Sequence, residues 1–295
     1  MKIIRRKADL RKITQTWRDD GASIGVVLTM GALHAGHLSL VQAAKARADR
    51  VIVTIFVNPR QFNNPEDLAK YPRTEDSDAA KLAPLAVDVL YVPDPDQIYP
   101  EGFATTISVT GVSDGLCGAT RPGHFDGVAT VVAKLLLQTD ADFSFFGEKD
   151  YQQLQVVRRL ATDLDLKTRI IPCPTLREPD GLAMSSRNLR LGAEARAAAP
   201  VIRDALTMAA RRIETGGDVA GALEDARRAL IAAGLAEIDY LDLRADPDLA
   251  PLASADRPAR LFVAAWLDGV RLIDNLPVQP RQAAQAPGPR PVEPA

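Results

Sequence analysis

Apolar segments that read as strands alternate with helical patterns over the first 174 residues, and this alternation constrains the fold most. Strand-like runs occur at 24–28, 51–57, 87–92, 105–109 and 142–146, and helical spacing follows at 38–48, 126–138 and 154–164. Most of these strands are apolar at successive positions, as in parallel sheets that are covered on both faces. We therefore predict an α/β fold with a doubly wound parallel sheet over residues 1–174.

The pattern changes after Pro172 and Pro174. A polar loop leads to two helical stretches, 193–214 and 219–233, and then to short strands at 238–243, 260–267 and 270–273. Asp268-Gly269 separates the last two strands and is a strong two-residue hairpin signal. Residues 175–281 should thus form a smaller α+β domain. The segment 282–295 contains prolines and almost no core-forming residues, so we expect a disordered tail.

Charge and cysteine content limit the classes of partner. The chain has 36 basic and 38 acidic residues, a net charge of −2, which gives no reason to expect nucleic acid or an anionic membrane. Cys117 and Cys173 are too few for a disulfide framework, which fits a reducing cytoplasm. The N-terminus has no signal-like apolar core, and no apolar run approaches the roughly 18 residues of a membrane span. We expect a soluble cytoplasmic protein.

Two of the three histidines, His34 and His37, lie in the segment MGALHAGH at 30–37, where the first predicted strand turns into its helix. A helix N-terminus offers unpaired N–H groups and partial positive charge, and Gly31 and Gly36 would let a phosphate approach the backbone. The imidazoles would add two donors. The alternatives are capping or packing histidines, and a zinc site, for which no third ligand is suitably spaced.

Two further segments carry donors suited to phosphate. Gly147-Glu148-Lys149-Asp150 follows a predicted strand and opens a helix, at the edge where open α/β sheets bind ligands. The loop 184–188, Met-Ser-Ser-Arg-Asn, offers two hydroxyls and a guanidinium. Either segment alone is equally consistent with a capped helix start or an ordinary surface loop.

Gln61 follows the second strand within Asn-Pro-Arg-Gln-Phe at 58–62, and it can both donate to and accept from a hydroxyl or carboxylate. Arg121-Pro-Gly-His124-Phe, directly before a helix, would extend the same pocket. A turn with satisfied polar groups is the alternative for each segment.

Six segments together resemble the pantothenate synthetase family, also called pantoate:beta-alanine ligase, within the HxGH nucleotidyltransferase superfamily. They are MGALHAGH, FVNPRQFNNPEDLAKYPRT, RPGHFDGV, GEKDYQQL, DGLAMSSRN and VAAWLDGVRLIDN. The resemblance as a whole spans about residues 3–278. Ala35 departs from an acidic residue common in the family. The resemblance implies a Rossmann-like fold and a cytosolic homodimer that condenses (R)-pantoate with beta-alanine, using ATP and Mg²⁺ and releasing AMP and pyrophosphate.

The resemblance also assigns site residues. Gln61 and Gln153 would hold the substrates pantoate and beta-alanine, His37 would be the catalytic acid, and the 58–74 loop with Tyr71 would gate the site. The Mg²⁺ ligands remain unassigned. The catalytic donors would be His34, His37, Lys149, Ser185, Ser186 and Arg187. The ATP-binding residues would be Met30, Gly31, Ala32, Leu33, His34, Ala35, Gly36, His37, Gly147, Glu148, Lys149, Asp150, Leu176, Met184, Ser185, Ser186 and Arg187.

Two other functions use the same phosphate-binding residues. A nucleotidylyltransferase would leave the nucleotide on its acceptor, and a nucleotide sensor would bind without turnover. A sensor has no need for acceptor-binding glutamines or a second basic loop. Neither cysteine lies in a phosphate-binding motif, and Ser185 and Ser186 have no histidine in theirs, so no residue is placed to hold an acyl group covalently. We therefore expect a pantoyl adenylate intermediate.

Overall fold

The computed structural model describes residues 1–280, and the tail predicted for 282–295 lies outside the described residues. A six-stranded parallel sheet has the order β1-β4-β3-β2-β5-β6. Its strands are β1 (Lys2–Ile4), β2 (Ile24–Thr29), β3 (Arg50–Ile55), β4 (Val89–Tyr91), β5 (Phe143–Gly147) and β6 (Arg169–Cys173). This is the predicted Rossmann-like α/β fold.

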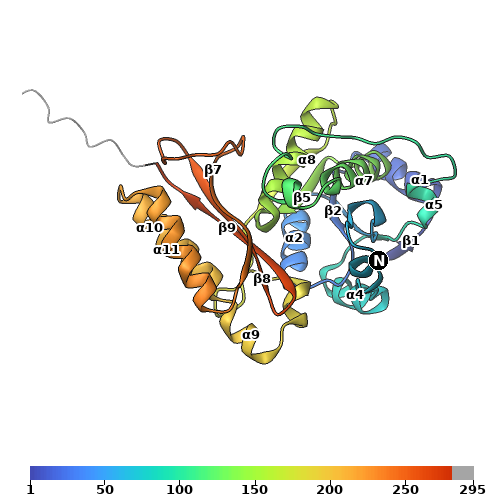
Figure 1. Cartoon of the computed structure of the whole chain (residues 1–295). Coiled ribbons are helices and arrows are strands. Elements are labelled where there is room, and N and C mark those ends of the chain that lie inside the picture. Colours follow the sequence, from blue (N-terminus) through green and yellow to red (C-terminus); the bar gives the residue numbers. More distant parts are fainter. Residues whose placement is uncertain (281–295) are drawn as a thin grey trace, which may run out of the picture.

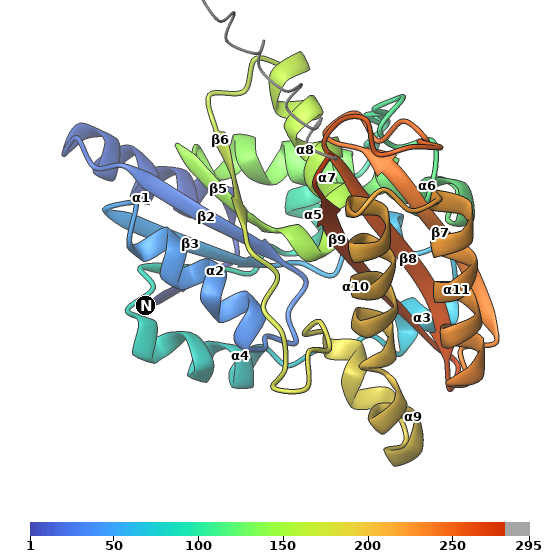
Figure 2. The same cartoon turned by 90° about the vertical axis from the view of Figure 1, so that its left-hand side faces the viewer.

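Helices cover both faces of this sheet because its central strands are apolar on both sides (Figures 1 and 2). In β2, Val26 packs with α1 (Lys7–Asp19), α7 (His124–Thr139) and α8 (Tyr151–Asp163), whereas Val27 packs with α2 (Ala35–Lys45) and α4 (Glu75–Leu82). Shorter helices are η1 (Pro59–Gln61), α3 (Pro65–Ala69), η2 (Ala83–Leu85), α5 (Pro95–Ile98), α6 (Cys117–Thr120) and η3 (Glu148–Asp150).

A second, antiparallel sheet follows, with the order β7 (Glu237–Ala245), β8 (Ala259–Leu267) and β9 (Val270–Val278). Its own apolar core packs against α10 (Val201–Glu214) and α11 (Val219–Ala232), beside the larger sheet in Figure 1. Asp268 and Gly269 both have positive φ, 52° and 69°, as the predicted tight hairpin requires. The link to this part contains η4 (Ser186–Arg190) and α9 (Ala193–Ala198).

Several predicted elements differ from the structure. The strand predicted at 105–109 is wrong: this segment is not in a sheet, and its Ile107 amide donates to the Thr130 hydroxyl of α7 at 3.0 Å. The helix predicted at 193–214 is two helices, because Pro200 lies between α9 and α10. The strands β1 and β6 and the helix α1 had not been predicted.

The arrangement places the carboxyl ends of β2, β3 and β5 near one another, since all strands of the large sheet run parallel. Within residues 1–280, no helix is both long and apolar enough to cross a membrane.

Candidate active site

The chain turns sharply after β2. Gly31 and Ala32 have positive φ, 86° and 51°. The backbone amides of Ala32 and Leu33 each donate a hydrogen bond of 2.8 Å to the carboxylate of Asp78. A side chain at Gly31 would come within 3.2 Å of the same carboxylate, in a backbone conformation that glycine adopts readily. A fully buried acid from α4 therefore holds this turn.

The two histidines lie at the N-terminus of α2. His34 Nδ1 accepts from the backbone amide of Gly36 at 3.1 Å, and His37 Nδ1 accepts from the backbone amide of His34 at 3.3 Å. Their ring centroids are 4.1 Å apart. Burial lowers the pKa of His34, and burial together with the neighbouring His34 lowers the pKa of His37 to about 3. Both imidazoles are therefore neutral near pH 7.

Gly36 leaves room for the His34 ring in its capping position. A Cβ atom at residue 36 would lie 2.9 Å from His34 Cε1, which is closer than Cβ atoms approach other atoms in real structures. The capping predicted as an alternative role for His34 is real. It does not compete with ligand binding, because capping uses Nδ1 and leaves Nε2.

Lys149 lies in the 3₁₀ turn between β5 and α8. Its side chain is 18% exposed, and its Nζ atom is 3.9 Å from the Asp150 carboxylate. The backbone carbonyls of Glu148 and Lys149 accept hydrogen bonds of 2.9 and 2.8 Å from Asn275 Nδ2 of β9. The second sheet thus contacts the turn that carries the lysine.

The serines and Arg187 lie in a folded loop. Met184 N donates to Leu176 O at 3.0 Å, and Ser185 Oγ accepts from the backbone amide of Arg187 at 3.2 Å. The Arg187 guanidinium is 3.7 Å from Asp67, in the predicted gating segment. The loop is therefore an ordered structure that is linked to the opposite side of the site.

Gln61 is the last residue of η1, a short turn that follows β3 after residues 56–58. Its Oε1 atom accepts from Asn58 Nδ2 at 3.1 Å, and its Nε2 atom lies 2.9 Å from Met30 Sδ. Its backbone carbonyl faces two groups of the RPGHF motif, His124 Nδ1 at 2.8 Å and Arg121 at 3.1 Å. The motif therefore supports the glutamine that precedes it in the chain.

One cavity of about 260 Å³ brings most of the predicted residues together. Imidazoles, cationic groups and hydroxyls line it along with two glutamine amides. The predicted residues in its wall are Met30, His34, Gly36, His37, Gln61, Tyr71, Gly147, Lys149, Asp150, Gln153, Leu176, Met184, Ser185, Ser186 and Arg187.

Five predicted ATP-binding residues do not line this cavity: Gly31, Ala32, Leu33, Ala35 and Glu148. Leu33 is buried in the core between α2 and the sheet, and Glu148 lies 3.8 Å from Arg260. They shape the backbone around the cavity, and their contact with ATP stays a prediction.

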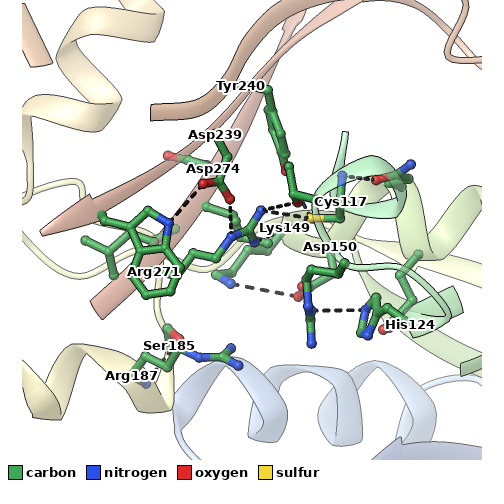
Figure 3. Close-up of a pocket in the computed structure, with 18 of the residues that line it drawn as sticks. Cys117, His124, Lys149, Asp150, Ser185, Arg187, Asp239, Tyr240, Arg271 and Asp274 are labelled. Carbon is green, nitrogen blue, oxygen red and sulfur yellow. Dashed lines mark hydrogen bonds and ion pairs between the residues drawn. The ribbon is translucent and has the colours of Figure 1, made fainter. Parts of the chain in front are cut away.

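A larger cavity of about 530 Å³ adjoins the first (Figure 3). Residues from the part with the parallel sheet and from the part with the antiparallel sheet both line it. Arg271 of β9 pairs with Asp239 at 2.6 Å and reaches Cys117 Sγ at 3.5 Å. Lys149, Asp150, Gln153, Ser185 and Arg187 line both cavities. The two cavities therefore share part of their walls.

Sequence reasoning missed the residues that support the site from a distance. The roles of these residues have no local signal, because their partners are far away in the chain; this holds for Asp78, Arg177, Asp274 and Asn275. The last two lie in a segment that resembles the family, but the resemblance assigned no role to either. Asp274, for example, accepts from Arg177 at 2.6 and 2.9 Å across 97 positions.

The fold and these cavities define a Rossmann-like α/β protein with a cation-lined cleft suited to a polyphosphate. Comparison with known proteins agrees with this class. The family model described as pantoate-beta-alanine ligase matches residues 2–277. The chain is 65% identical over 276 residues to the pantothenate synthetase of Chelativorans sp. (strain BNC1), covering 94% of this chain and 97% of that one.

Solved structures give the same result. Pantothenate synthetase from Thermus thermophilus superposes with a TM-score of 0.89 at 43% identity, covering 95% of this chain and 100% of that one. Pantoate-beta-alanine ligase from Francisella tularensis, complexed with beta-gamma ATP and beta-alanine, gives 0.80 at 38% identity, covering 94% and 97%. The chain belongs to the pantoate-beta-alanine ligase family.

Proposed function

We propose that the protein condenses (R)-pantoate with beta-alanine at the expense of ATP, and releases pantothenate, AMP and pyrophosphate. One observation carries this proposal: in a chain of this family, a single cavity joins phosphate donors to two glutamine amides. The donors suit a nucleoside triphosphate, and the amides suit the hydroxyls and carboxylate of pantoate.

In the first step a pantoate carboxylate oxygen attacks the α-phosphorus of ATP, and the bond to the bridging oxygen of pyrophosphate breaks. Negative charge grows on the phosphoryl oxygens and on the leaving group. Preorganised donors stabilise such charge. We assign this role to His34, His37, Lys149, Ser185, Ser186 and Arg187, with His37 as the acid or hydrogen-bond donor to the leaving pyrophosphate.

In the second step the amine of beta-alanine attacks the acyl carbon of pantoyl adenylate. The new amide bond forms as the acyl–oxygen bond to AMP breaks, and the amine loses its proton. We propose that beta-alanine arrives through the larger cavity, because that cavity meets the smaller one at Lys149, Gln153 and Ser185.

The described residues fit magnesium that arrives with the nucleotide. Among them, no group of three or more His, Cys, Asp or Glu side chains could hold a metal ion. Mg²⁺ commonly binds substrate phosphates, water and only one or two carboxylates. Asp150 lies beside Lys149 in the cavity and is the carboxylate that we assign to this role. When bound, the ion would neutralise charge on the leaving pyrophosphate.

Residues 1–174 form the ATP- and pantoate-binding domain in this proposal, and residues 175–281 form a lid domain. Separate sheets support the division, and most apolar residues of the second sheet form a core of their own, although Leu249 and Phe262 pack with the core of the larger sheet. The 58–74 segment acts as a gate: Asp67 lies 3.2 Å from Arg190 and 3.7 Å from Arg187, so opening requires these two ion pairs to break.

We further propose that the protein is a cytoplasmic homodimer. Family membership supports a homodimer, which light scattering would measure directly. Two buried cysteines that form no disulfide support a reducing cytoplasm.

The test is product analysis with ATP, Mg²⁺, (R)-pantoate and beta-alanine. We expect pantothenate, AMP and pyrophosphate in equal amounts, and none of them from the Lys149→Ala variant. A product that keeps the nucleotide would favour a nucleotidylyltransferase instead. Binding of ATP without any turnover would favour a sensor.

A further inference from the structure

Asn275 of β9 has been given no role in the chemistry described above, yet it contacts the turn that carries Lys149. Asn275 is 4% exposed; it lines the larger cavity but not the smaller one. Its Nδ2 atom donates to the carbonyls of Glu148 and Lys149, at 2.9 and 2.8 Å. These bonds cross 127 and 126 positions in the chain, from the second sheet to the turn after β5.

The neighbours of Asn275 fix the orientation of its amide. Its Oδ1 atom accepts from Arg260 Nη1 at 2.6 Å, so the NH₂ group must face the two carbonyls. The Arg260 guanidinium stacks 3.7 Å from the Tyr151 ring centroid and lies 3.8 Å from Glu148. A group that accepts on one side and donates twice on the other is required here, and an asparagine amide supplies both.

The preceding residue, Asp274, supports the second segment that carries donors to the cavity, the loop 184–188. Asp274 is 4% exposed and holds Arg177 through two hydrogen bonds, of 2.6 and 2.9 Å. Arg177 follows Leu176 and forms a bridge to Ala183, at the base of the loop that carries Ser185 and Arg187. Two adjacent residues of β9 thus contact both loops that carry donors to the cavity.

We propose that Asn275 is a positioning residue for Lys149: it fixes the turn 148–150 so that the ammonium group faces the phosphates. This inference rests on the proposed function and adds to it the residue that couples the second sheet to the nucleotide site. Because Asn275 acts through Lys149, its contribution should vanish when the lysine side chain is absent.

The first measurement compares wild type with Asn275→Ala. We expect kcat to fall about 10- to 100-fold, the range for a misplacement of about 1 Å. Calorimetric titration of ATP alone should show weaker binding. The KM for pantoate should change by less than about 2-fold, because Gln61 and Gln153 are untouched. Equal changes in pantoate and ATP parameters would mean that Asn275 is only structural and would overturn the proposal.

The second measurement is a double-mutant cycle with Lys149→Ala. Adding Asn275→Ala to Lys149→Ala should change ATP affinity by less than about 2-fold, although the same substitution weakens ATP binding in wild type. An equal effect in both backgrounds would show that Asn275 does not act through the lysine. If Asn275→Ala does not fold, Asn275→Ser keeps a polar donor at the buried site, and the same non-additivity is expected.

Tyr151→Phe is the matched control. It removes a hydrogen bond of 2.5 Å to Asp246, which also joins the two parts of the chain, but it keeps the ring under Arg260. Its effect on ATP affinity should be small and the same with or without Lys149. Failure of the wild type to release AMP with pantoate would reject the proposed function, whereas additivity in an active enzyme would reject only the role of Asn275.

Discussion

The Nδ1 atom of His37 accepts a hydrogen bond from the backbone amide of His34, at 3.3 Å. A neutral imidazole that accepts at Nδ1 carries its proton at Nε2. The pKa of His37 is lowered to about 3, so this neutral form dominates near pH 7 in the free protein. In the proposed reaction, His37 would donate from Nε2 as charge develops on the phosphates.

His37→Ala should therefore lower kcat by about 10²-fold or more, the usual loss for a positioned acid or donor. Steady-state kinetics of pyrophosphate release measures it. Ser39→Ala is the matched control on the same helix, because it removes only a 2.8 Å bond to the Gly36 carbonyl and should keep kcat within about 2-fold. Wild-type turnover in a folded His37→Ala protein would remove His37 from the mechanism.

Gln61→Ala should raise the KM for pantoate far more than the KM for ATP. The substitution removes a donor and an acceptor, and the unpaired partners should cost about 1–3 kcal/mol of binding, or roughly 5- to 150-fold. Initial rates with each substrate varied in turn separate the two constants. A parallel rise in both would assign Gln61 to the support of Asn58 and η1 instead.

Asp78→Asn should destabilise the turn that precedes α2. The carboxylate accepts from Ala32 and Leu33, and an amide can accept with only one of its two ends. We expect the free energy of unfolding to fall by about 2–3 kcal/mol in urea titrations, and ATP binding to weaken. Glu75→Gln, which loses a partly exposed ion pair to Arg5, should cost less than about 1 kcal/mol. Equal stability of both variants would contradict the role of Asp78.

Stability should fall in acid partly through His124. Burial, together with the nearby Arg121, lowers the pKa of His124 to about 4 from 6.5. The unfolded chain therefore binds a proton first, and stability present above pH 6.5 is lost as the pH falls towards 4. At pH 5 this amounts to about 2 kcal/mol. His124→Asn should reduce the difference in unfolding free energy between pH 7 and pH 5, and an unchanged difference would be evidence against this source.

The features that could be predicted from the sequence are those that depend on local residue patterns. The strand from Ile24, the α2 N-terminus with its histidines and the Asp268-Gly269 hairpin follow from periodicity, helix capping and turn chemistry, and the structure contains all three. The short strand β1 and the break at Pro200 show the limit of such patterns. Three residues at a sheet edge give no periodicity, and an alanine-rich run hides a helix boundary.

The supporting residues of the site could not be predicted, for a different reason. Asp78 reaches the turn after β2 across 46 positions, and Asn275 reaches Lys149 across 126. Such contacts depend on how distant elements pack. An aspartate or asparagine in a helix or strand has no local pattern that distinguishes it from a solvated side chain.

Pyrophosphate exchange without beta-alanine tests the central claim, that the cavity activates pantoate by adenylation. Wild-type protein should incorporate labelled pyrophosphate into ATP only when pantoate and Mg²⁺ are both present, and Lys149→Ala should not. Exchange in the absence of pantoate, or exchange that requires beta-alanine, would contradict the two-step reaction, and ADP as the product would reject attack at the α-phosphorus.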